Sequence, residues 1–164
     1  MNKLPFQKAL CLVLIVLMLV STLGACSALS PRDPLELQNF LDLMEEKGFD
    51  IVDYTIALTG ELEELIALYL IAISPNESYQ IEFIKLHTIA GAQSVFAGTR
   101  ESAEALRGNA SSHSSVSGVN HNTFHLTSAG LYSHLLQVDD IFVFVLGADA
   151  GYRDEIRTIF DLLS

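Results

Sequence analysis

The chain has 164 residues, half of them hydrophobic, and its 20 acidic side chains outnumber the 9 lysines and arginines to give a formal net charge of −11. This excess of negative charge argues against a nucleic-acid partner, because binding to phosphates needs Lys and Arg. It also disfavours a domain that lies flat on an anionic membrane surface, and by itself such acidity mainly keeps a protein soluble.

The first residues have the layout of an export signal. Lys3 and Lys8 form a positively charged start, residues 9–20 are an unbroken apolar run, and small residues follow. This order is typical of a secretory signal peptide. The alternative is an uncleaved membrane helix over residues 9–25, which is short for a span. Both interpretations place the rest of the chain outside the cytoplasm.

The tetrapeptide Leu23-Gly24-Ala25-Cys26 closes this segment. It resembles the lipobox of bacterial lipoproteins. The resemblance implies that residues 1–25 are removed as a signal peptide, that the thiol of Cys26 is diacylated, and that the new N-terminus is often acylated too, for example with palmitate. Two or more chains would anchor the protein stably, because each buried CH₂ contributes about 0.8 kcal/mol.

The same resemblance implies a location on the extracytoplasmic face of the cell membrane. Ser27 follows the cysteine, whereas Asp in that position typically retains a lipoprotein in the inner membrane of a Gram-negative cell. In such a cell we therefore expect the outer membrane, and in a Gram-positive cell the outer face of the plasma membrane.

Cleavage before Cys26 would leave 139 residues, with 7 Lys and Arg against 20 Asp and Glu. That length suits one domain with its own core. We predict a lipidated cysteine and short linker over 26–34 and a single α+β domain over 35–164. Cys11 would be lost with the signal and Cys26 would be lipidated, so the domain would contain neither a disulfide nor a thiolate metal site.

A helix begins the domain. Asp33 suits the N-cap, Pro34 the first helical position, and Gly48 the residue after the C-terminal end. Apolar residues recur at helical spacing along one face; these are Leu37, Phe40, Leu41 and Met44. The alternating residues 49–55 predict a strand.

Residues 65–74 are almost wholly apolar, so periodicity alone does not separate a buried strand from a buried helix. We favour a strand, because 75–78 is a turn and 79–86 is a second strand, which together predict a hairpin. A helix that includes Leu65 remains the alternative. Residues 60–64 suit a loop or one helical turn.

The second half contains a helix over 88–106 and then, over 108–118, a loop with five serines that we expect to be mobile. Strands follow over 123–127, 131–138 and 141–146, the last apolar throughout and therefore central. A helix over 151–163 ends the chain. The predicted order is α-β-β-β-α-β-β-β-α, which is an α+β fold with a mainly antiparallel sheet and packed helices.

The mature chain also resembles small exported lipoproteins of Gram-positive anaerobes that carry no assigned activity. Three stretches carry this similarity: Gly48-Phe49-Asp50-Ile51-Val52-Asp53, Tyr79-Gln80-Ile81-Glu82-Phe83, and 138–163. They are patterns of strands and helices, so the resemblance supports the fold and implies nothing about mechanism.

Histidines are the reactive groups that stand out. His121 and His125 point to one face of a strand, about 13 Å apart, which is too far for one metal ion unless the chain bends. If Ala129 alone forms the centre of the next turn, His134 lies on the other face. If Ala129 and Gly130 form a two-residue loop, His134 pairs directly with His125.

Asp139 and Asp140 are adjacent in a turn, and with His121 and His125 they are the weak candidates for a cation site. We predict no metal and no cofactor. The chain contains no Gly-x-Ser-x-Gly, Ser-x-x-Lys, calcium-loop or glycine-rich phosphate-loop motif, so we predict no catalytic residues and no enzyme.

These features lead us to expect a non-enzymatic, membrane-tethered binding or accessory module. The membrane would be contacted through the lipid anchor, and an envelope protein is the possible further partner. The alternative is a lipoprotein that binds a small ligand or a cation.

Overall fold

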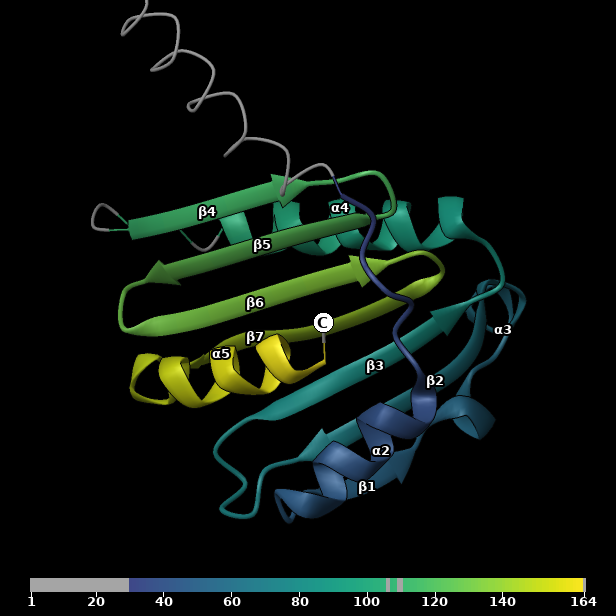
Figure 1. The fold of residues 1–164 in the computed structure, drawn as a ribbon, viewed down its shortest axis with the longest axis horizontal. Coiled ribbons are helices and arrows are strands. Elements are labelled where there is room, and N and C mark those ends of the chain that lie inside the picture. Colours follow the sequence, from purple (N-terminus) through teal and green to yellow (C-terminus); the bar gives the residue numbers. More distant parts are fainter. Residues whose placement is uncertain (1–29, 106, 109–110, 164) are drawn as a thin grey trace, which may run out of the picture. The chain divides into compact units, whose positions relative to one another are not determined.

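Seven antiparallel strands form one sheet in the computed structural model, which describes residues 30–105, 107–108 and 111–163 (Figure 1). The signal, the lipobox and Cys26 lie outside the described residues. From one edge to the other, the strands are β1 (Asp50–Asp53), β2 (Ile66–Ile73), β3 (Gln80–Leu86), β7 (Ile141–Asp149), β6 (Leu131–Val138), β5 (His121–Ser128) and β4 (Ser111–Ser117).

Helices cover both faces of the sheet. Figure 1 shows α2 (Leu37–Glu46) and α5 (Arg153–Leu162) on one face and α4 (Ile89–Ala105) on the other. Each face has its own apolar core, with Phe40 and Phe160 in the first and Phe96 in the second. No helix among the described residues is both long and apolar enough to cross a membrane.

The prediction of an α+β fold with a mainly antiparallel sheet is confirmed. The strand prediction for 65–74 is also confirmed, since β2 pairs with β1 on one side and with β3 on the other. Residues 60–64 correspond to a helical turn, α3 (Glu61–Leu65), which precedes β2 directly. Two short 3₁₀ turns, η2 (Thr55–Ala57) and η3 (Ala150–Tyr152), complete the described elements.

The prediction of a mobile loop over 108–118 is wrong. Residues Ser111–Ser117 form β4, which pairs with β5 without a break from Ser111↔Ser128 to Ser117↔Asn122. All seven residues of β4 are exposed, so the strand has no apolar face that its sequence could reveal. With β4 and α3 included, the described order is α-β-α-β-β-α-β-β-β-β-α.

The predicted start of the first helix is also wrong. The helix begins at Leu37, and its N-cap is Glu36, whose side chain makes no capping hydrogen bond. The predicted end is confirmed. Gly48 has a φ of 74°, and the Phe49 N–H donates to the Met44 carbonyl, as expected where glycine ends a helix in a left-handed conformation.

The β5–β6 hairpin has the second of the two registers left open by the sequence. Ser128 pairs with Leu131, so Ala129 and Gly130 form a two-residue loop, and both have positive φ (52° and 80°). This loop places His125 opposite His134.

Candidate functional site

Polar residues of three strands gather on the sheet face that carries α5. Ser114, His125 and His134 are successive cross-strand partners on β4, β5 and β6. The neighbouring row on the same face runs from Ser112 through Thr127 to Tyr132. Directly paired residues point to the same side of a sheet, so the two rows form one polar patch.

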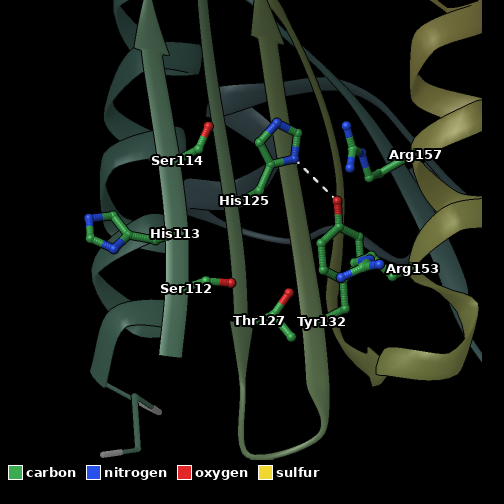
Figure 2. Close-up of a pocket in the computed structure, with 8 residues that line it drawn as sticks. All are labelled: Ser112, His113, Ser114, His125, Thr127, Tyr132, Arg153 and Arg157. Carbon is green, nitrogen blue, oxygen red and sulfur yellow. Dashed lines mark hydrogen bonds between the residues drawn. The ribbon is translucent and has the colours of Figure 1, made fainter. Parts of the chain in front are cut away.

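A pocket of about 240 Å³ lies between this patch and α5 (Figure 2). Its lining residues are Ser112, His113, Ser114, His125, Thr127, Tyr132, Arg153 and Arg157. The two arginines are four residues apart on α5, which brings both to the same side of the helix.

His113 differs from the other lining residues. Figure 2 shows its ring on the side of β4 away from His125, whereas Ser112 and Ser114 point toward the pocket. The ring of His113 contacts the guanidinium of Arg107. His113 therefore borders the pocket through β4 itself, and its ring lies on the other side of the strand.

Two of the lining residues, His125 and Tyr132, belong to a hydrogen-bonded triplet with the buried His134. The hydroxyl oxygen of Tyr132 is 3.2 Å from Nδ1 of His125 and 3.3 Å from Nδ1 of His134. A tyrosine has one hydroxyl proton, so Tyr132 donates to at most one of the two rings and accepts from the other. At least one of the two histidines consequently carries a proton on Nδ1.

Burial decides which histidine can be charged. His134 is 3 % exposed and stacks on Phe160 at a centroid separation of 3.8 Å. Burial, with smaller effects of His125, Arg157 and Arg32, lowers the pKa of His134 to about 2. Its ring is therefore neutral at physiological pH and accepts the proton of Tyr132 when Nδ1–H of His125 donates to the tyrosine oxygen.

His125 is only partly buried. Desolvation lowers the pKa of His125 most, and the charges of Arg157 and Arg32 lower it further, while Asp161 acts in the opposite direction. Burial also raises the pKa of Tyr132 to about 12. The fixed positive charges of the pocket lining are thus the guanidinium groups of Arg153 and Arg157.

The described residues that line the pocket include no Asp or Glu. Arg153 is paired with Asp154, its neighbour on α5, at 3.1 Å, whereas Arg157 has no ion pair among the described residues. Hydroxyl groups of Ser112, Ser114 and Thr127 add further donors. Guanidinium groups together with neutral donors are the groups that bind carboxylate, phosphate or sulfate oxygens.

The four residues singled out from the sequence do not form one site. His121 is buried, and its Nδ1 has no partner among the described residues. Asp139 accepts a hydrogen bond from Asn120, and Asp140 lies 3.9 Å from Lys85. Only His125 lines the pocket. The described residues contain no group of three His, Cys, Asp or Glu that could hold a metal ion.

Sequence reasoning missed Tyr132, Arg153 and Arg157. The available signal was the pair of arginines four residues apart on an otherwise acidic and amphipathic last helix. Comparison with known proteins adds no further residue, because no family model, no curated protein and no solved structure matches this chain.

Proposed function

We propose that this protein is a membrane-tethered extracytoplasmic lipoprotein whose domain binds a small anionic ligand in the pocket between β4, β5, β6 and α5, without catalysing a reaction. One observation carries the proposal. A chain with 20 acidic and 9 basic residues has a pocket with two arginines and no carboxylate among its described lining residues.

The tether rests on the resemblance of Leu23-Gly24-Ala25-Cys26 to a lipobox. An accessory role toward an envelope protein remains compatible with this anchor. The pocket favours the small-ligand alternative instead, and its positive charge disfavours a cation as the ligand.

The size of the pocket restricts the ligand. A volume of about 240 Å³ lies below the roughly 300–1,000 Å³ that is usual for drug-sized ligands. Phosphate, sulfate or a small organic acid would fit, with the anionic group between Arg153 and Arg157 and the hydroxyls of β4 and β5 as additional donors.

Thermal unfolding of the full chain in detergent, with sulfate, phosphate or citrate added at constant ionic strength, tests the binding. A ligand at about 100 times its Kd stabilises the folded state by about 2.7 kcal/mol. We expect Arg157→Gln to remove this stabilisation. Lys47→Gln at the C-cap of α2, which removes one positive charge outside the pocket lining, should retain it. Equal losses in the two variants would show general charge screening and would refute the pocket.

A separate experiment tests the tether. Cys26→Ala should abolish palmitate labelling and leave residues 1–25 uncleaved. A cleaved, membrane-bound Cys26→Ala product would refute the lipobox interpretation while leaving the pocket proposal intact.

A further inference from the structure

The two edges of the sheet differ in how they are protected. Edge strands expose backbone N–H and C=O groups, and proteins usually shield them with charged residues, short length, proline or bulges. The β1 edge follows this rule, since it has four residues and carries an aspartate at each end, Asp50 and Asp53.

The β4 edge has none of these protections. It is seven residues long, contains no proline and no charged Asp, Glu, Lys or Arg, and its pairing with β5 has no bulge. The sheet order ends at β4, so its outer backbone groups have no strand partner among the described residues.

We propose that β4 is a dimerisation edge, which pairs antiparallel with β4 of a second copy of this chain about a two-fold axis at Ser114. In this register Ser114 faces its own counterpart. His113 then faces Ser115, Ser112 faces Val116, and Ser111 faces Ser117. A two-fold interface requires one surface to be complementary to itself, and these small or neutral pairs satisfy that requirement.

Between the two edges of the described sheet, charge favours pairing with a second copy at β4 and not at β1. Each chain has a formal net charge of −11, so most contacts between two copies would bring carboxylates together. At the β1 edge, antiparallel self-pairing would place Asp50 opposite Asp53, and like charges directly opposite one another destabilise a sheet. At β4 no such pair arises, because the strand carries no carboxylate.

The geometry of the pair also suits the candidate site. An axis perpendicular to the sheet places the same face of both copies on one side, so both α5 helices and both pockets share that side. Ser112 and Ser114 line the pocket of each copy. In the dimer, these serines would form the sheet surface that separates the two pockets. The segment before α2 runs over the same face of each copy (Figure 1).

Cysteine cross-linking of the full-length protein in membranes tests this interface. Facing residues of antiparallel strands have Cα atoms about 4.5–5.5 Å apart, which is within the usual range for a disulfide of about 4.4–6.8 Å. Under mild oxidation, Ser114→Cys should convert most of the protein into a disulfide-linked dimer. Val52→Cys on β1 is the matched control and should remain monomeric, and the parental chain measures any background from Cys11 and Cys26.

The register has its own test. Ser112→Cys co-expressed with Val116→Cys should give mixed dimers, whereas Ser112→Cys alone should not. Ser114→Lys should shift the detergent-solubilised protein from dimer to monomer in light scattering, because two lysines would meet at the axis. Its circular dichroism should be unchanged, since Ser114 is exposed. A monomeric parental protein, or cross-linking at Val52→Cys equal to that at Ser114→Cys, would overturn the proposal.

Discussion

His125 and His134 face each other across β5 and β6 with ring centroids 4.0 Å apart. They share the hydroxyl of Tyr132, and the pKa of each is lowered, mainly by burial. The pair therefore connects the core to the pocket, because His134 is buried against Phe160 and His125 lines the pocket.

The first prediction is that the protein loses stability as the pH falls below about 6.5. An unfolded histidine binds a proton near that pH, whereas folded His134 has a pKa of about 2. The unfolded state then binds more protons, so the free energy of unfolding falls with the pH, by roughly 1 kcal/mol per pH unit for one such group. Urea unfolding between pH 7.5 and 5 measures the slope before most carboxylates titrate.

His134→Phe is the matched variant for this slope. Phenylalanine keeps a ring against Phe160 but does not titrate, so the slope should decrease to the part contributed by His121 and His125, whose pKa values are also lowered. An unchanged slope in His134→Phe would contradict the assignment.

The second prediction concerns anion binding, and it rests on the proposed function. An anion beside Arg157 would offset the charge that lowers the pKa of His125, so binding should be accompanied by proton uptake at this ring. The affinity should therefore rise as the pH falls through the pKa of His125, which lies below its usual value. Calorimetry with sulfate, whose charge is constant over this range, measures the effect.

In the control variant His125→Gln, the affinity for sulfate should be nearly independent of pH. At low pH the variant should therefore bind sulfate more weakly than the parental protein does. A pH dependence equal to that of the parental protein would show that another group takes up the proton.

The sequence reveals those elements that have an apolar pattern. Phe40 and Met44 predicted the buried face of α2, and the turn after β2 predicted its hairpin with β3. In contrast, β4 was missed because an exposed edge strand is held by backbone pairing with β5 and has no apolar alternation. The pocket was missed because β4, β5, β6 and α5 each contribute only part of it.

The register of the β5–β6 hairpin is the other feature that the sequence did not determine. The sequence left the pairing of His125 open, since a shift of one residue in the turn moves a side chain to the opposite face. The positive φ of both Ala129 and Gly130 fixes the two-residue loop, and only this loop places Tyr132 and His134 beside His125. Alanine in the first position gives no sequence signal for such a turn.

The third prediction is that Thr123→Val stabilises the protein. Thr123 is 7 % exposed, and its hydroxyl oxygen has no hydrogen-bond partner among the described residues. A buried, unsatisfied polar group costs about 1–3 kcal/mol, and valine also suits a strand. We expect a higher urea midpoint for Thr123→Val. Thr127→Val, at a more exposed position of the same strand, should gain little, and a loss at Thr123 would indicate a partner for its hydroxyl.

The fourth prediction is that Ala129→Asn stabilises the β5–β6 hairpin. Two central residues with positive φ form a type I′ turn, for which Asn-Gly is the preferred sequence. Because a left-handed conformation costs an L-residue such as alanine roughly 1–2 kcal/mol and asparagine less, the free energy of unfolding should rise by up to about 1 kcal/mol. Ala129→Val, which is β-branched and tolerates this conformation poorly, should lower it. If both variants were equally stable, the backbone at Ala129 would not be left-handed, and the register that joins His125 to His134 would need another cause.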